Sequence, residues 1–391
     1  MKKYGHPGLL KHGQVSTEGS PLSPPLIRSS TFEYPDRESH NHATDGSDRF
    51  YARNGHEIGR LVEARLAGLE QAEGALLFSS GIAAITAVLL GLSESGSRLA
   101  LSRYSYGGTL ALAKEVLPTY GIQVELFDPF DPVQVDRALA NKPDLVQVET
   151  PINPTLRLLD IEAFASRVHA AGALLSVDAT FIPPPFQRCL HQGADLVVHS
   201  ATKFFGGHSD VLAGVVLGRD AELVRLEDWR RKTGPILGQD AAWLLNRSLE
   251  TLELRFREQS ARARDLAQHL EQTRDELGIE ALHYPGLETH PDHELGERTL
   301  HTFGSMLSFE LTGGLARAGR AFDALQTIHR GPSLGGTESL ICLPAETSHA
   351  MLSEAEMHSI GFGPGLLRLS VGLEPLDQLI GDLEQALQPR S

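Results

Sequence analysis

The stretch DLVVHSATKFFGGHSD, residues 195–210, carries most of the information on the fold and the chemistry of this chain. Its apolar start predicts a buried strand, and the strand leads into Ser200, Thr202 and Lys203. A lone lysine is usually a surface residue. Burial at a strand end lowers the pKa of a lysine, and Schiff-base chemistry requires a neutral amine. The two hydroxyls can donate to a phosphate, and the glycine pair that follows permits a close backbone approach.

Similar short apolar runs occur on both sides of this stretch. The predicted strands are GALLFSSG, SRLALS, QVELFD, DLVQVET, ALLSVDAT, ADLVVHS and GVVLG. Helical patterns separate most of them, among them GRLVEARLAGLEQAE, IAAITAVLLGLS and DIEAFASRVHAAG. Short strands that alternate with helices predict βαβ units and a mainly parallel sheet.

The chain divides into three parts. Residues 1–58 are rich in Gly, Pro, Ser and His and predict an arm that packs on a second subunit. Residues 59–249 form the α/β domain. A long helical pattern over residues 243–272 predicts a helix that bridges into a smaller α+β domain, residues 250–391, with strands SMLSFELT and LLRLSVGLE and helices LARAGRAFDALQ and PLDQLIGDLEQAL.

Composition excludes several classes of protein. The net charge of −15 disfavours a nucleic-acid or anionic-membrane partner, because phosphates require clustered Lys and Arg. Two cysteines without a CxxC pair exclude a zinc ribbon or a thioredoxin-type motif. No signal peptide and no apolar stretch of membrane-spanning length is seen, so we expect a cytoplasmic protein.

Residues 195–209 match the PLP (pyridoxal 5'-phosphate) attachment signature of the Cys/Met metabolism enzymes at every position. Over about residues 10–380 the chain resembles the cystathionine γ-synthase/γ-lyase type. The resemblance implies that Lys203 carries PLP as a Schiff base. It also implies PLP-dependent transferase fold type I, aspartate-aminotransferase-like, with a mainly parallel seven-stranded sheet in the PLP-binding domain. The implied assembly is a homotetramer of two catalytic dimers.

The resemblance assigns further residues to the cofactor ring. Asp178, in VDAT, would lie against the pyridine nitrogen and keep it protonated. Thr180 would lie against the ring. Tyr106, in YGGT, would stack on the ring and assist proton transfer. Asn153, in ETPINPT, would bond the 3-hydroxyl oxygen.

The segment SSGIAA, residues 79–84, predicts a turn that opens a helix, where free amides and the helix dipole form an anion site. The resemblance assigns Ser80, Gly81 and Ile82 to the PLP phosphate. Together with the hydroxyls named above, they complete the phosphate site that this chain itself is expected to supply.

A second set of phosphate ligands is expected from the neighbouring subunit. RFYAR, residues 49–53, resembles the YxR motif of the family, in which Tyr51 and Arg53 reach the neighbour's PLP phosphate. The usual continuation, Asn-Pro-Thr, is absent, and residues 55–57 read Gly-His-Glu instead.

The C-terminal motifs SLGGTESL and LLRLSVGLE imply the substrate contacts. Arg368 would clamp the α-carboxylate of the substrate bidentately. Ser333 or Ser339 would assist. Glu338 resembles the active-site Glu of γ-synthases and γ-lyases, which favours chemistry at the γ-carbon.

Several positions depart from the family patterns that recognise the distal end of the substrate. Gly108 replaces the cysteine usual in methionine γ-lyases, which argues against that activity. Ala111 replaces an arginine common in cystathionine enzymes, and Phe50 and Asn54 replace charged residues of the γ-synthases. These changes indicate a less charged distal group, or recognition by other residues such as residues 56–57.

We therefore expect γ-replacement or γ-elimination on homoserine-derived or sulfur amino acids. Alternatives are an O-acylhomoserine sulfhydrylase, a methionine γ-lyase-like enzyme, another PLP reaction such as transamination or β-elimination, and a non-catalytic PLP-binding relative. His290 and His293 resemble a metal-ligand pair, but Pro291 excludes a regular helix face and no further ligands at zinc spacing follow, so no metal is expected.

Overall fold

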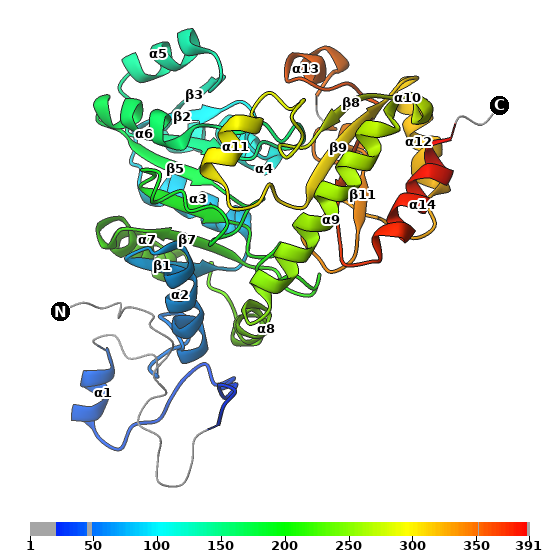
Figure 1. Cartoon of the computed structure of the whole chain (residues 1–391). Helices are drawn as coiled ribbons and strands as arrows, with labels where there is room; N and C mark the ends of the chain where they lie inside the picture. Colours follow the sequence, from blue (N-terminus) through cyan, green and yellow to red (C-terminus); the bar gives the residue numbers. More distant parts are fainter. Residues whose placement is uncertain (1–20, 45–48, 351, 389–391) are drawn as a thin grey trace.

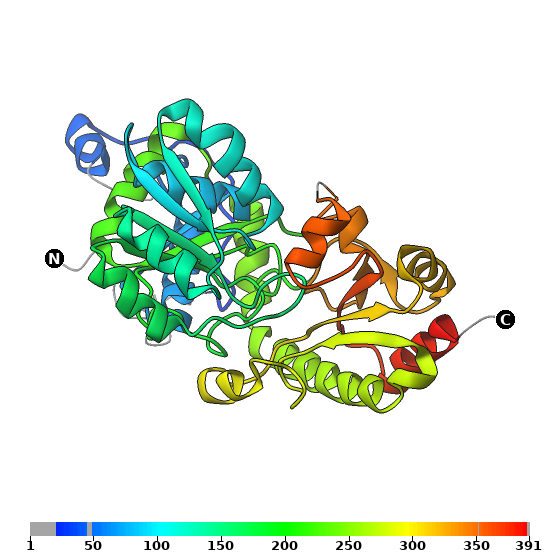
Figure 2. The same cartoon turned by 90° about the horizontal axis from the view of Figure 1, so that it is seen from above.

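The structure, a computed structural model, describes residues 21–44, 49–350 and 352–388. Its larger domain, coloured blue to green in Figure 1, lies beside a smaller domain coloured lime to red. Helix α9 (Leu252–Gln272) joins the two. Figure 2 shows the same two bodies side by side from above.

The larger domain is built on a seven-stranded sheet in the order β1-β7-β6-β5-β4-β2-β3. Its strands are β1 (Gly74–Phe78), β2 (Arg98–Ser102), β3 (Gln123–Phe127), β4 (Leu145–Glu149), β5 (Leu174–Asp178), β6 (Leu196–His199) and β7 (Gly214–Gly218). β7 is antiparallel to both of its neighbours, and the other neighbouring pairs are parallel. The predicted α/β class and the mainly parallel sheet are therefore confirmed.

Side chains of these strands alternate between two cores, because successive residues of a strand point to opposite faces. Ala75 and Leu77 of β1 pack into the core under α2 (Glu57–Glu70), α6 (Ile161–Ala170) and α8 (Gln239–Leu249). Leu76 and Phe78 pack into the core under α3 (Gly81–Gly91) and α7 (Asp220–Thr233). Helices cover both faces, which explains why the strands read as continuous apolar runs.

The helical segments of the larger domain and the arm lie before, between and after these strands in the chain. They are α1 (Arg37–Thr44), α2 (Glu57–Glu70), α3 (Gly81–Gly91), α4 (Gly107–Ala111), a π-helical turn (Leu112–Val116), a 3-10 turn (Leu117–Tyr120), α5 (Pro132–Ala140), α6 (Ile161–Ala170), α7 (Asp220–Thr233) and α8 (Gln239–Leu249).

The smaller domain is a five-stranded sheet in the order β10-β11-β12-β9-β8, packed against α9, α12 and α14. Its strands are β8 (Ile279–His283), β9 (Met306–Leu311), β10 (His329–Arg330), β11 (Leu340–Cys342) and β12 (Leu366–Ser370). Its helical segments are α10 (Arg274–Leu277), α11 (His293–Thr299), α12 (Gly314–Ala324), a 3-10 turn (Pro344–Glu346), α13 (Glu354–Ser359) and α14 (Leu376–Leu387). β9 and β12 are the two strands predicted here.

The single long helix predicted over residues 243–272 was wrong. The chain turns between α8 and α9, where the amide of Thr251 donates to the carbonyl of Ser248. The buried guanidinium of Arg255 fixes this corner by donating to the carbonyls of Ser248 (3.0 Å) and Phe204 (3.1 Å). The two cores divide further along, within α9, where Phe256 belongs to the first and Ala263 to the second.

The described part of the arm projects from the base of the larger domain in Figure 1. It contains the short helix α1, and the Asp36 carboxylate accepts a hydrogen bond from the Ser39 amide at the start of this helix. The arm is held to α8 by an ion pair between Arg28 and Asp240. Residues 1–20 and 45–48 of the predicted arm lie outside the described residues.

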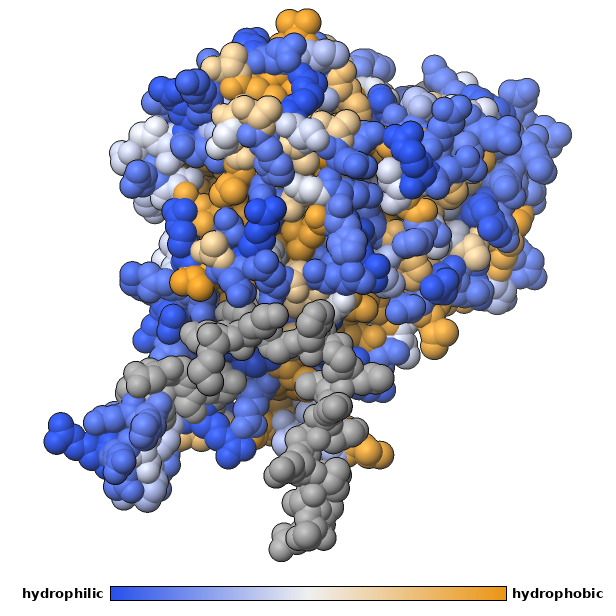
Figure 3. Space-filling view, turned by 60° about the vertical axis from the view of Figure 1, so that its left-hand side comes forward, coloured by the Kyte–Doolittle hydropathy of each residue, from blue (hydrophilic) through white to orange (hydrophobic). Residues whose placement is uncertain are grey.

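The face shown in Figure 3 is largely hydrophilic, with hydrophobic residues in patches between the polar ones. Among the described residues, no helix is both long enough and apolar enough to cross a membrane.

Candidate functional site

A cavity of about 600 Å³ lies where the carboxyl ends of β4, β5 and β6 face the smaller domain, the position where open α/β sheets bind ligands. Its lining comes from both domains. The lining residues are Ser80, Gly81, Ile82, Ile85, Tyr106, Glu149, Pro151, Asn153, Asp178, Thr180, Phe181, Ser200, Thr202, Lys203, Leu212, Pro332, Leu334, Thr347, Ser348 and Arg368. Most of the residues predicted for the cofactor are therefore brought together here.

Lys203 enters the cavity from the turn that follows β6. Its Nζ donates a hydrogen bond of 2.7 Å to the Ser333 hydroxyl. Burial lowers the pKa of Lys203 to about 8, and the positive charge of Arg368 contributes to the same shift. The lysine thus has the lowered pKa that its place at a strand end predicted.

Two carboxyl groups end neighbouring strands beside this lysine. Asp178 of β5 lies opposite Glu149 of β4 in the strand register. The Asp178 carboxylate accepts hydrogen bonds from the Thr180 hydroxyl (2.6 Å) and amide (3.1 Å). Burial raises the pKa of both carboxyl groups, and the charge of Asp178 raises that of Glu149 further. A nearby positive charge would therefore stabilise the ionised form of each carboxyl group.

Glu149 was not assigned a role from the sequence. Its carboxylate accepts hydrogen bonds from the backbone amides of Tyr106 (2.8 Å) and Asn153 (3.4 Å). It thereby fixes two segments that line the cavity. Its position in the sequence could have indicated a role in the site, since Glu149 ends a predicted strand just as Asp178 does.

Arg368 reaches the cavity from β12 of the smaller domain. Its guanidinium donates to the Asn153 side-chain oxygen (2.9 Å) and to the Pro332 carbonyl (3.0 Å). Its Nε is buried and has no hydrogen-bond partner among the described residues. A buried donor without a partner is costly, so this face of the guanidinium is suited to an anionic ligand.

The first turn of α3 forms another wall. Ser80 caps the helix, with its hydroxyl accepting from the Ala83 amide at 3.2 Å. A Cβ at Gly81 would lie 2.7 Å from the Ser200 Cβ, so only glycine lets this turn approach the lysine segment. The helix start is therefore open to the cavity, where its unbonded amides suit an anion.

Thr202 departs from the expectation made for it. Its hydroxyl donates to the Ala213 carbonyl (3.1 Å) and accepts from the Ala213 amide (3.0 Å). A hydroxyl has one proton, and here that proton is used within the fold. The predicted donation from Thr202 to a phosphate is thus not available in this arrangement, because the hydroxyl instead holds the lysine segment to the start of β7.

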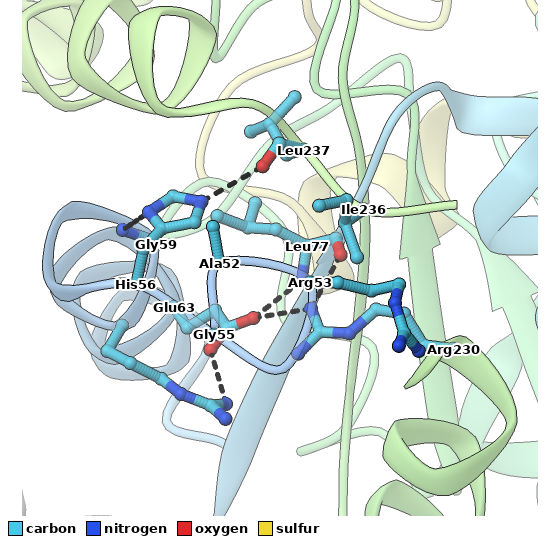
Figure 4. Close-up of a pocket in the computed structure, with 11 residues that line it drawn as sticks. Ala52, Arg53, Gly55, His56, Gly59, Glu63, Leu77, Arg230, Ile236 and Leu237 are labelled. Atoms are coloured by element: carbon cyan, nitrogen blue, oxygen red, sulfur yellow. Dashed lines mark hydrogen bonds and ion pairs between the residues drawn. The ribbon is translucent and has the colours of Figure 1, made fainter. Parts of the chain in front are cut away.

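Five predicted residues are not among those that line this cavity, and one of them, Ser333, bonds to Lys203 as described above. Tyr51 is exposed, and Arg53, which is labelled in Figure 4, donates to the Arg231 carbonyl. The Ser339 hydroxyl donates to Glu374 at 2.7 Å and is fully buried. Glu338 accepts a hydrogen bond from the Ser209 hydroxyl.

The two histidines that resemble a metal-ligand pair are engaged locally. His290 contacts the Thr155 carbonyl and His293 the Pro285 carbonyl, and Asp292 forms an ion pair with Arg157. Within the described ranges, no group of three or more His, Cys, Asp or Glu residues could hold a metal ion.

Comparisons with known proteins give a consistent picture. The family model described as "Cys/Met metabolism PLP-dependent enzyme" matches residues 9–388. An L-methionine gamma-lyase of Pseudomonas deceptionensis is 37% identical over 390 residues, covering 98% of this chain and 95% of the relative. An O-succinylhomoserine sulfhydrylase of Pseudomonas aeruginosa is 39% identical over 353 residues, covering 88% and 87%.

A solved structure of similar fold is the cystathionine gamma synthase of Xanthomonas oryzae pv. oryzae in complex with cystathionine. It aligns with a TM-score of 0.88 at 36% identity, over 94% of this chain and 92% of the other. The expected fold type is therefore confirmed at the level of the whole chain.

Proposed function

The chain belongs to the family of Cys/Met metabolism PLP-dependent enzymes, and from this premise we propose that it acts at the γ-carbon of homoserine-derived or sulfur-containing amino acids. The reaction is γ-replacement, in which a thiol displaces the γ-substituent, or γ-elimination, which releases the γ-substituent together with an α-keto acid and ammonia. One observation carries the proposal: Lys203, Asp178 and Arg368, from three separate segments, line the same cavity.

The residues of the cavity fit PLP. Asp178 and Glu149 are adjacent buried carboxyl groups with raised pKa values, and a protonated pyridine nitrogen would supply the positive charge that they lack. Lys203 has a pKa of about 8 and is thus a ready amine for an aldehyde. The open first turn of α3 suits the phosphate.

When bound, PLP supplies an electron sink for the negative charge that develops at the substrate Cα. Lys203 holds the cofactor and, once its Nζ is free, accepts the Cα proton. Asp178 keeps the pyridine nitrogen charged. Arg368, held by the Asn153 side-chain oxygen, would bind the α-carboxylate, and Asn153 would also bond the 3-hydroxyl oxygen of the cofactor.

Other residues that line the cavity are placed to contact the cofactor. Tyr106, half exposed in the cavity lining, would stack on the ring and assist proton transfer. Thr180 packs against the ring, and its hydroxyl joins Asp178 to the Ser200 amide. Ser80, Gly81 and Ile82, with the Ser200 hydroxyl, bind the phosphate.

The arm completes the site from a second copy of the chain. Tyr51 and Arg53 lie away from the cavity of their own chain, and Tyr51 is 41% exposed. In a homo-oligomer of catalytic dimers these two side chains bind the phosphate of the neighbour. The homotetramer and the cytoplasmic location remain predictions.

The distal end of the substrate is uncharged in this proposal. Among the described lining residues, the charged ones are Glu149, Asp178, Lys203 and Arg368, and each has a part in holding the cofactor or the α-carboxylate. Glu57, which the sequence offered for recognition of the distal group, forms an ion pair with Arg49. Thioethers and acyl esters of homoserine whose distal group carries no charge are therefore favoured over cystathionine.

The test is a visible spectrum followed by turnover of O-acylhomoserines, cystathionine, homocysteine and methionine, with and without a thiol. We expect bound PLP to absorb in the visible range, Lys203→Ala to abolish turnover, and Lys114→Ala, at an exposed lysine, to leave it unchanged. Protein that takes up no PLP would sink the proposal. PLP uptake without turnover of any of these amino acids would favour the non-catalytic relative, and efficient use of cystathionine would contradict the uncharged distal group.

A further inference from the structure

The Gly-His-Glu segment at residues 55–57, which replaces the usual family continuation, has no part in the proposed chemistry. Figure 4 shows the ring of His56 between the start of helix α2 and the chain segment that carries Leu237. His56 is the N-cap of α2, with extended backbone angles (φ −152°, ψ 152°). It therefore lies just after the turn that presents Tyr51 and Arg53.

Both nitrogens of the His56 ring are used. Nδ1 accepts a hydrogen bond from the Gly59 amide at 3.0 Å, and Nε2 lies 2.9 Å from the Leu237 carbonyl. An amide can only donate and a carbonyl can only accept, so the ring is neutral with its proton on Nε2. No lone pair or proton of the ring is left for a substrate, which removes His56 as a candidate for distal recognition.

The helix that His56 caps is fixed to the sheet. Glu63 of α2 accepts from the Leu77 amide (3.0 Å), and Arg230 donates to the Leu77 carbonyl (2.6 Å) and to Glu63 (2.7 Å). Both charged side chains are buried. The start of α2, where His56 lies, therefore has a fixed position relative to the sheet.

The segment at residues 234–238 connects His56 to the other phosphate-binding element. Leu237 accepts from His56, and two residues earlier the Pro235 carbonyl accepts from the Ser79 amide at 3.2 Å. Ser79 immediately precedes the turn that opens α3. One short segment therefore lies between His56 and the first turn of α3.

The turn that directly precedes His56 is closed by two backbone hydrogen bonds. The Asn54 amide donates to the Tyr51 carbonyl (2.8 Å), and the Gly55 amide donates to the Ala52 carbonyl (3.2 Å), which closes the turn against the cap. Arg53 is anchored at the other end of the same region through the Arg231 carbonyl. The position of the Tyr51 and Arg53 side chains consequently depends on where the cap holds the turn.

We propose that His56 is a positioning residue that links two PLP phosphate sites of a dimer: it ties the turn of Tyr51 and Arg53, which serves the neighbour's phosphate, to the segment that supports the first turn of α3, which serves the phosphate of its own chain. This inference rests on the proposed function. His56 touches neither cofactor nor substrate. It acts by holding two separate phosphate-binding segments in one geometry.

The test compares His56→Asn with His56→Ala. Asparagine is a good N-cap, so it keeps the bond to the Gly59 amide, but it is too short to bond the Leu237 carbonyl as well. Alanine loses both. Asp131→Ala, which removes the cap of α5 and its bond to the Val133 amide, is the matched control for loss of a cap elsewhere.

The measurements on the full-length, PLP-free protein are the Tm, the Kd for PLP and the Kd for pyridoxal, which lacks the phosphate. We expect His56→Asn to keep nearly the wild-type Tm and the wild-type Kd for pyridoxal. Its Kd for PLP rises about tenfold, the upper end of the effect of one lost hydrogen bond between neutral groups. His56→Ala lowers the Tm as well, whereas Asp131→Ala lowers the Tm with an unchanged Kd for PLP.

Two results would overturn the inference alone: a wild-type Kd for PLP in His56→Asn, or equal weakening of PLP and pyridoxal. The second would indicate a general effect on the fold. A wild-type protein that binds no PLP would overturn the proposed function and this inference with it.

Discussion

The lowered pKa of Lys203 has a measurable consequence for the reactivity of its amine. With a pKa of about 8 in place of 10.5, the neutral amine at pH 7 amounts to about one molecule in ten, against about one in three thousand for an ordinary lysine. Lys203 in PLP-free protein should then react with an acylating reagent about 300-fold faster than its ordinary pKa allows. Because the Arg368 charge contributes to the shift, Arg368→Gln should move the midpoint upwards.

The assay is competitive acetylation of PLP-free protein between pH 6 and 10.5, read by mass spectrometry of the peptides that carry Lys203 and the exposed Lys114. Reactivity of Lys203 should rise with pH and level off above a midpoint near 8, and in Arg368→Gln it should level off at higher pH. A midpoint near 10.5 would refute the argument from burial. A midpoint that Arg368→Gln leaves unchanged would refute the electrostatic part.

Three further results are expected. Asp178→Asn should retain PLP but lose about a hundredfold or more in kcat, the scale of one electrostatic group at a reacting centre, and a near-normal rate would contradict its role at the ring nitrogen. Arg368→Lys should raise KM for amino-acid substrates about 10- to 100-fold with PLP binding intact, because an ammonium cannot replace the bidentate guanidinium and its bond to Asn153. An equal loss of PLP binding would argue against a role of Arg368 in binding the α-carboxylate. Phe256→Ala should lower the free energy of unfolding by about 3–5 kcal/mol in denaturant titration, since its buried ring packs on two other aromatic rings, while Leu254→Ala, 71% exposed, should cost little.

Local sequence was sufficient for much of the fold. The strands of the larger sheet are short apolar runs with helices between them, and this pattern can be recognised from the local sequence alone. Lys203 and Asp178 follow or end such strands, so parallel topology alone places them at one edge of the sheet. The arrangement of β8, β10 and β11 had no comparable local signal.

Long-range contacts account for what the sequence did not reveal. The turn between α8 and α9 depends on Arg255, whose bond to the Phe204 carbonyl joins residues far apart in the chain. The Thr202 hydroxyl is consumed by Ala213, a partner that no motif specifies. His56 became interpretable only when the Leu237 carbonyl was seen beside it.

Helix α9 constrains how the length of this chain can change during evolution. It runs without interruption from Phe256 in one core to Ala263 in the other, about 10 Å at 1.5 Å per residue. Inserting one residue between them would rotate the smaller domain by about 100° relative to the larger. Arg368 would leave the cavity of Lys203, and both cores would lose their register with the helix. Insertions and deletions should therefore be purged from this span, although loops elsewhere in the chain remain free to vary in length.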